Sequence, residues 1–201
     1  MKMPVVFLFL LMLLTSCVKL HDYPKGWSKL KEFSSPTCPS IAGIYNDCSD
    51  ASSNSYGCSL YYEFARLAPL ESNPPSSSCN SDRRVELQQP DSDTLVVIGL
   101  NNEIILNRQF TRGADTKWER DFHFFYNPPT AFECENSSLV LKMKTIGIGV
   151  GEACYSNQRL FLYQTVNGDL VIQDKVEANY QMYIVPLLII QKYWCRWHRV
   201  N

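Results

Sequence analysis

The sequence predicts a mainly β protein: an antiparallel barrel or sandwich of eight or nine strands with one short N-terminal helix. Apolar and polar residues alternate with period two through most of the chain from residue 83 onward. Aromatic residues make up 12% of the 201 residues, which favours strands. Turn residues divide this part into short runs, and many short strands joined by short connections are typical of barrels and sandwiches.

The composition is that of an ordinary globular domain. Hydrophobic residues are 45% and charged residues 19% of the chain, which excludes an intrinsically disordered protein. The 19 Lys and Arg and 20 Asp and Glu give a net charge of −1, so we expect no nucleic-acid partner. Eight cysteines favour an oxidising compartment.

The first residues have the pattern of an export signal. Lys2 supplies a positive charge, and residues 5–14 are an unbroken apolar run. That run is too short to span a bilayer, which needs roughly 20 apolar residues. It leads into Thr15-Ser16-Cys17. Together with the preceding leucine, these residues resemble the bacterial lipobox, which has an aliphatic residue, two small residues and a cysteine.

The lipobox resemblance covers residues 1–17 only, and it implies cleavage before Cys17 and attachment of lipid to the Cys17 sulfur. Two or three acyl chains, at about 0.8 kcal/mol per buried methylene, anchor a protein firmly. Aspartate after the lipidated cysteine favours retention in the inner membrane, whereas this chain has Val18. The resemblance therefore implies a lipid-anchored protein of the outer membrane that faces the periplasm. The alternative is an ordinary secretory signal and a secreted, disulfide-rich β protein without lipid.

Three parts are expected: a lipoprotein signal peptide at residues 1–16, a lipidated tether at 17–37 and a single disulfide-containing β domain at 38–201. The tether shows no sustained period and is rich in Lys, Pro, Gly and Ser, so we expect a solvated linker.

Within the domain, a helix is expected from Ser59, a suitable N-cap, to about Pro69. The expected strands are residues 83–89, 94–100, 103–110, 121–126, 138–148, 159–166, 169–177, 180–190 and 192–199. In the expected strand at residues 169–177, Asp174 interrupts an otherwise apolar face formed by Leu170, Ile172 and Val176.

Turn residues refine this expectation. Asn167-Gly168 suits the positive φ angles of a type I′ hairpin, and Asn101-Asn102 suits a second hairpin. Pro186 cannot donate a ladder hydrogen bond, which predicts an edge strand or a bulge. The glycine-rich run at 147–151 ends a strand, so we expect a bulge or a close backbone approach rather than a phosphate-binding loop.

The cysteine count predicts one unpaired thiol. If Cys17 carries lipid, seven cysteines remain, so at most three disulfides form. Loop-closure entropy favours local partners such as Cys48 with Cys58, and Cys134 and Cys154 flank one strand region. The connectivity stays open at this point.

The sequence provides no set of catalytic or metal-binding residues. No GxSxG, HExxH, Walker A or GxGxxG motif occurs. Asp121 and His123 share a strand face, but no nucleophile lies beside them, so we expect a structural histidine. Cys195 and His198 look like half a zinc site, yet residues three apart on a strand point to opposite faces. We therefore expect no enzyme, no cofactor and no metal.

The leading hypothesis is a non-enzymatic outer-membrane lipoprotein with a structural or protein-interaction role. The alternative is a carrier of a small apolar ligand, because Gly43-Ile44-Tyr45 resembles the Gly-x-Trp of lipocalins, without the tryptophan. An envelope hydrolase is a third hypothesis that lacks a nucleophile. The expected partners are the membrane, through the lipid anchor, and an unknown protein or small apolar ligand.

Overall fold

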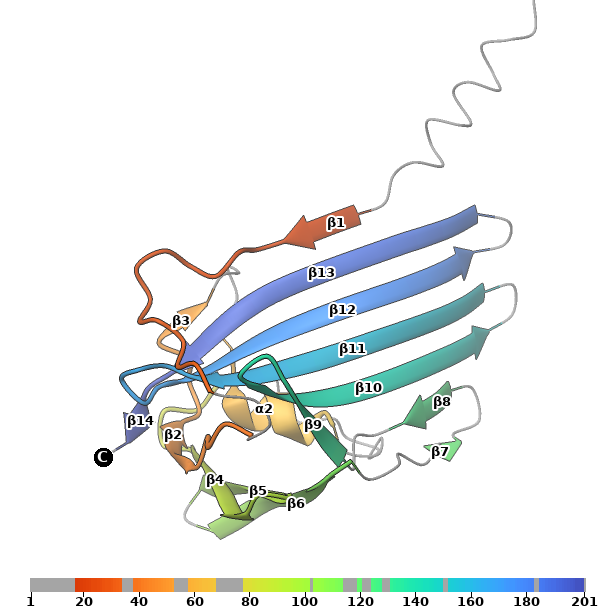
Figure 1. Ribbon diagram of the computed structural model, residues 1–201. Coiled ribbons are helices and arrows are strands. Elements are labelled where there is room, and N and C mark those ends of the chain that lie inside the picture. The colour runs from red at the N-terminus through yellow and green to blue at the C-terminus, as the bar shows by residue number, and fades with distance from the viewer. Residues whose placement is uncertain are drawn as a thin grey trace, which may run out of the picture.

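The computed structural model describes residues 17–33, 38–52, 58–67, 78–101, 103–113, 119–120, 124–127, 131–149, 152–182 and 185–200. Within these residues the chain forms one sheet of 14 strands and one short helix (Figure 1). The predicted mainly β fold with a single short helix is therefore confirmed.

The N-terminal part contributes three short strands and the helix. These elements are β1 (Cys17–Leu20), β2 (Gly43–Asn46), β3 (Ala51–Ser52) and α2 (Leu60–Ala65). Ser59 caps the helix as predicted, because its Oγ accepts a hydrogen bond from the Tyr62 amide at 3.0 Å.

Six further strands form the middle of the chain. They are β4 (Arg84–Asp91), β5 (Thr94–Asn101), β6 (Glu103–Arg112), β7 (Glu119–Arg120), β8 (Phe124–Asn127) and β9 (Ala131–Glu135). The four long strands β10 (Ser138–Gly149), β11 (Glu152–Gln164), β12 (Leu170–Met182) and β13 (Val185–Trp197) follow, and β14 (Arg199–Val200) ends the chain. The long strands pair as an antiparallel meander.

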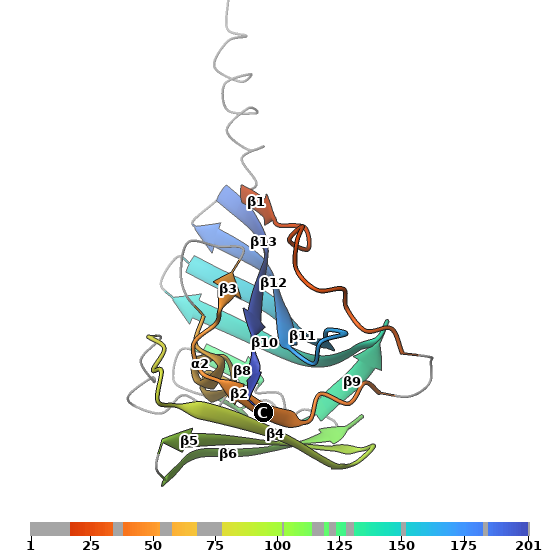
Figure 2. The same ribbon diagram turned by 90° about the vertical axis from the view of Figure 1, so that its left-hand side faces the viewer.

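The sheet is curled but open. Its main order is β1-β13-β12-β11-β10-β9-β6-β5-β4-β2-β14, so β14, which follows β13 after one residue, ends the opposite side of the sheet. Figure 2 shows β4, β5 and β6 at the bottom of the view, below the stack formed by β10 to β13. The expected closed barrel is therefore wrong, and so is a sandwich of two separate sheets.

The sheet is also mixed, which corrects the expected antiparallel arrangement. β1 runs parallel to β13 and covers part of the edge of that strand. β6 and β9 are parallel as well, because the chain makes an excursion through β7 and β8 before it returns to the sheet. Pro186 pairs with Gln181 of β12 on one side, and on the other side the described pairing of β13 with β1 runs from Ile189 to Lys192.

The turn after β11 differs from the predicted type, and the predicted type occurs in another hairpin. Gly168 has φ 89°, while Thr165 pairs with Asp169 through the Thr165 amide at 2.9 Å. Residues 166–168 thus form a three-residue hairpin loop that ends in a left-handed glycine. The predicted two-residue type I′ turn at Asn167-Gly168 is wrong. Type I′ geometry occurs instead between β9 and β10, where Asn136 and Ser137 both have positive φ.

The hydrophobic core lies on the inner side of the curled sheet. Leu60 and Phe64 of α2 are fully buried there with Val85 and Leu87 of β4 and Trp197 of β13. Tyr45, the last residue of the lipocalin-like triplet, belongs to the same core, and burial raises its pKa to about 12. The inner side is thus packed with side chains.

Candidate functional site

The segment expected to be a solvated linker packs across the outer face of the sheet. We call residues 21–33 the strap. Its start is held where Trp194 Nε1 donates a hydrogen bond to the His21 carbonyl at 2.8 Å. Further along, the Lys31 amide donates to the Gln164 carbonyl at 2.7 Å. These two hydrogen bonds therefore fix the strap to strands β13 and β11 of the sheet.

Aromatic rings fill the space between the strap and the sheet. Tyr23 meets Trp194 edge to face with ring centroids 5.2 Å apart, and Tyr163 lies 5.8 Å from the same indole. Trp27 contacts Tyr23 at 5.7 Å, and the Arg196 guanidinium lies 5.1 Å from the Trp27 ring. Such edge-to-face and cation–π contacts contribute roughly 0.5–1.5 kcal/mol each.

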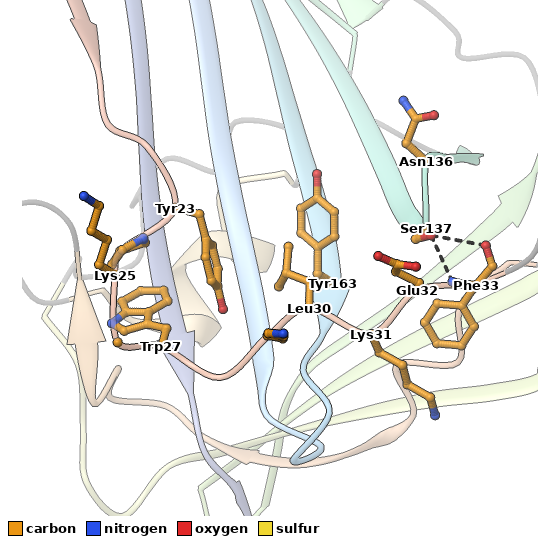
Figure 3. A pocket seen from close by; sticks show the side chains of 13 residues that line it. Tyr23, Lys25, Trp27, Leu30, Lys31, Glu32, Phe33, Asn136, Ser137 and Tyr163 are labelled. Carbon is orange, nitrogen blue, oxygen red and sulfur yellow. Dashed lines mark hydrogen bonds between the residues drawn. The ribbon is translucent and has the colours of Figure 1, made fainter.

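The far end of the strap is fixed by the β9–β10 hairpin. The Phe33 amide donates to Ser137 Oγ at 2.9 Å, and the same hydroxyl donates to the Phe33 carbonyl at 3.2 Å (Figure 3). A disulfide between Cys38 and Cys134 then joins the chain beyond the strap to β9. The strap is consequently held at both ends.

Between strap and sheet lies an open groove of about 810 Å³, which we call the strap groove (Figure 3). It is lined by Tyr23, Pro24, Lys25, Gly26, Trp27, Lys29, Leu30, Lys31, Glu32, Phe33, Asn136, Ser137 and Tyr163. Its volume is within the range of ligand sites.

The groove combines an apolar floor with a basic rim. Tyr23, Trp27 and Tyr163 are half-buried, whereas the lining lysines Lys25, Lys29 and Lys31 are exposed. Among the described residues, no carboxylate forms an ion pair with any of these lysines. Burial raises the pKa of Tyr23 and Tyr163, so both phenols stay protonated at neutral pH. The lining therefore offers stacking surfaces, hydroxyl groups and positive charge.

A second polar site is buried on the inner face. Asp174 Oδ2 receives hydrogen bonds from Gln158 Nε2 at 2.6 Å, Tyr193 Oη at 2.5 Å and Arg66 Nη2 at 2.8 Å. Arg66 also forms a salt bridge with Glu63, one turn earlier on α2. Asp174 Oδ1 has no hydrogen-bond partner among the described residues, although Asp174 is only 1% exposed. The residue that interrupts the apolar pattern of β12 is thus the centre of this Asp174 cluster.

Burial and charge shift the ionisation of the Asp174 cluster. Burial raises the pKa of Glu63, and this outweighs the opposing effect of the neighbouring Arg66 guanidinium. Burial also raises the pKa of Tyr193, with further contributions from Glu63 and Asp174. For Arg66, burial lowers the pKa, but the two carboxylates more than compensate and the pKa is raised. Arg66 therefore remains charged, and it balances one of the two carboxylates.

The cysteines form three disulfides, and Cys154 is a free thiol in the part of the chain that is described. The pairs are Cys38–Cys134, Cys48–Cys79 and Cys58–Cys195. Local pairing of Cys48 with Cys58, or of Cys134 with Cys154, is therefore wrong. Folding of the sheet brings distant strands together, and this outweighs the entropic preference for short loops.

The predicted site residues are distributed over the molecule. The backbone of Cys17 lies in β1, in register with Ile189 of β13. Asp121 and His123 are outside the described residues. Cys195 is in a disulfide and cannot bind zinc as a thiolate.

His198 has two carboxylate neighbours on opposite sides of its ring. Nδ1 lies 2.9 Å from Asp169 Oδ1 and Nε2 lies 3.2 Å from Asp50 Oδ2. These carboxylates face different ring nitrogens, so they do not converge on one metal position. Within the described ranges, no three His, Cys, Asp or Glu side chains form a metal-binding group.

The strap groove was missed because the strap has no helical or strand period. The signal that could have indicated it is the recurrence of large apolar residues, Tyr23, Trp27, Leu30 and Phe33, in a segment that is otherwise polar. A solvated linker has no need for such side chains.

Among the described residues, no helix is long and apolar enough to span a membrane.

No protein-family model, curated protein or solved structure matches the chain significantly.

Proposed function

We propose that this protein is a non-enzymatic lipoprotein that is held on the periplasmic side of the outer membrane by lipid on Cys17 and that binds an acidic segment of a partner protein in the strap groove. The single observation that carries the binding role is the basic rim over an aromatic floor. Three exposed lysines lie beside one glutamate in the lining, and no described carboxylate neutralises them.

The shape of the groove favours a chain segment as its occupant. Its lining follows successive residues of the strap from Tyr23 to Phe33, so the available contacts form a row rather than a closed pocket. Carboxylate side chains of a bound segment would pair with the lysine rim, and apolar side chains would pack on Trp27, Leu30 and Tyr163. This pattern of alternating contacts is characteristic of peptide recognition.

The alternative hypothesis of a small apolar ligand requires apolar space inside the curled sheet. The described part of that space holds the hydrophobic core and the Asp174 cluster. A ligand there would have to displace packed side chains, which costs free energy. We therefore favour the acidic segment.

A binding experiment tests the proposed role. A fluorescein-labelled peptide of alternating Glu and Leu is titrated with the purified, oxidised protein, and its anisotropy is measured at low and high salt. We expect binding that weakens with salt and that the triple variant Lys25→Gln/Lys29→Gln/Lys31→Gln loses at least about tenfold in affinity, since each tenfold corresponds to about 1.4 kcal/mol.

Two controls make the result specific. Lys144→Gln removes an exposed lysine of β10 outside the groove and is expected to bind like the unchanged protein. A peptide with Lys in place of Glu is expected not to bind. Equal affinity of the triple variant and the unchanged protein would show that the strap groove is not the acidic-segment site.

A further inference from the structure

Cys17, the residue proposed for lipidation, lies beside β13, close to the end where β12 and β13 are joined. Figure 1 shows the ends of β10 to β13 projecting past α2 and past β4 to β6. Cys17 lies in register with Ile189, and Ile189 is paired with Ala178 of β12. The proposed anchor is therefore only four residues along β13 from Val185, where that strand begins. At about 3.4 Å per residue, this separation is about 14 Å.

The part of β12 and β13 beyond this position carries no charge. No Asp, Glu, Lys or Arg occurs between Glu177 and Lys192. Glu177 pairs with Ile190, and Lys192 pairs with Lys175. The charge-free part thus begins at the row of residues that contains Cys17. The polar residues of this part are the uncharged Asn179, Gln181 and Gln191, and the charged residue nearest its end is Glu152 of the neighbouring strand β11, in register with Met182.

Large apolar side chains are exposed on both faces of this end. Leu188 is 40% exposed and Tyr155 is 39% exposed, and both are in register with Asn179, so they share one face. Tyr180, the next residue of β12, points to the opposite face and is 41% exposed. A protein partner that docks on a sheet would cover one face. Exposure on two faces instead suits a medium that surrounds the end of the sheet.

We propose that the ends of β12 and β13 are seated edge-on in the interfacial region of the bilayer that holds the Cys17 lipid. The inference rests on the proposed lipidation of Cys17 and adds a second, non-covalent contact between the domain and the membrane. Tyrosine is enriched at the level of lipid headgroups, because its ring is apolar and its hydroxyl is polar. Interfacial elements bury their apolar faces about 5–10 Å deep, a depth that the charge-free part exceeds.

The charges at the border of this surface fit the same orientation. At this border Glu177 forms a salt bridge with Lys175 at 2.6 Å, and Lys192, the residue of β13 paired with Lys175, lies on the domain side of the charge-free part. Lysines at that level can contact anionic headgroups while the apolar end lies deeper. The seated end thus fixes the orientation of the domain, with the strap groove toward the opposite end of the long strands.

Spin labelling of the lipidated protein tests this seating. In a Cys154→Ser background, Leu188→Cys and Val166→Cys each receive a nitroxide. Val166 is an exposed apolar residue at the other end of the long strands and provides the matched control. The proteins are reconstituted into vesicles of phosphatidylethanolamine and phosphatidylglycerol. Power saturation then compares collisions with oxygen, which concentrates in the bilayer, and with a water-soluble nickel chelate.

We expect the label at position 188 to collide mainly with oxygen and the label at 166 mainly with nickel, a several-fold difference in the ratio. Nickel-dominated collisions at both positions would overturn the seating. Spin–spin broadening at 188 that disappears on dilution with unlabelled protein would overturn it too, because a second copy would then cover this end. Fatty-acid incorporation is measured in the same preparations. A lipidated protein with position 188 in water contradicts the seating alone, whereas a protein without fatty acid contradicts both proposals.

Discussion

Arg66 and Asp174, 108 residues apart in the sequence, form a salt bridge of 2.8 Å that joins helix α2 to the inner face of strand β12. The side chain of Asp174 is 1% exposed and that of Arg66 is 17% exposed, so the pair is largely shielded from water. A helix of six residues has little stability of its own. Its position on the sheet therefore depends on this contact together with the packing of Leu60 and Phe64.

Replacing Asp174 is expected to destabilise the fold strongly. In Asp174→Ala, Arg66 stays buried beside Glu63 alone, and Tyr193 and Gln158 lose their acceptor. Removal of one partner of a buried pair typically costs about 3–5 kcal/mol. Urea denaturation followed by fluorescence measures this loss. Asp93→Ala, which breaks an exposed pair with Arg112, is the control, with an expected change of about 0–1 kcal/mol. Similar losses in both variants would show that the Asp174 cluster has no special role.

Glu63 gives the fold a characteristic pH dependence. Because burial raises its pKa in the folded state, Glu63 binds its proton more tightly when folded than when unfolded. Its contribution to stability is then largest below the unfolded pKa of about 4.3 and is lost as pH rises through the raised folded pKa. Glu63→Gln lacks this titration. We expect the stability of the unchanged protein relative to Glu63→Gln to fall as pH increases, measured by urea denaturation across that window. A relative stability that rises with pH would contradict the raised pKa.

The disulfides are expected to contribute unequally. Cys38 and Cys134 are separated by 96 residues, whereas Cys48 and Cys79 are separated by 31. If constraint of the unfolded chain dominates, loss of the longer loop costs about 1 kcal/mol more, within the usual 2–5 kcal/mol for a native bridge. Double Cys→Ser variants of each pair, compared by urea denaturation, measure the difference. A larger loss for the shorter loop would show that native-state contacts, not chain entropy, decide the ranking.

Lipid attachment is expected to depend on the Cys17 sulfur. Cys17→Ser replaces the thiol by a hydroxyl, which is a far poorer nucleophile for transfer of a diacylglyceryl group. Metabolic labelling with a radioactive fatty acid is expected to mark the unchanged protein and not the variant. Cys154→Ser, which removes the thiol that is free among the described cysteines, is the control and is expected to be labelled normally. Absence of label from the unchanged protein would contradict the anchor.

The alternating part of the sequence predicts most strands of the domain, and the reason is visible in the sheet. Val85 and Leu87 of β4 are buried while the alternating Arg84 and Glu86 are partly exposed, so burial of one face of a strand produces a period of two in the sequence. The same logic explains Asp174, whose place in the apolar row marks a buried polar site rather than an error in the pattern. A single polar residue in a core-facing row is thus an indicator of function or specificity.

The strap and the disulfide connectivity depend on tertiary contacts that leave no periodic signal. The strap is shaped by what it covers, Trp194 and Tyr163, which lie in strands far along the chain. Parallel pairing of β1 with β13 likewise depends on where the strap leads, not on the residues of β1. Curling of the sheet brings β13 to the segment before α2, and this joins Cys195 to Cys58. Local rules of spacing and entropy therefore could not predict these features.

The connectivity of the disulfides has a consequence for biogenesis. None of the three pairs joins cysteines that are consecutive along the chain, since Cys58 lies between Cys48 and Cys79 and the other two pairs span longer stretches. A chain whose cysteines oxidise in order of synthesis would link neighbouring cysteines such as Cys38 and Cys48, which is not a native bridge. Exchange of such bonds proceeds through mixed disulfides over seconds to hours, depending on oxidant and isomerase. The native connectivity is thus reached from such a bond only by isomerisation, and we expect a host with a strong oxidase but no isomerase to accumulate scrambled chains.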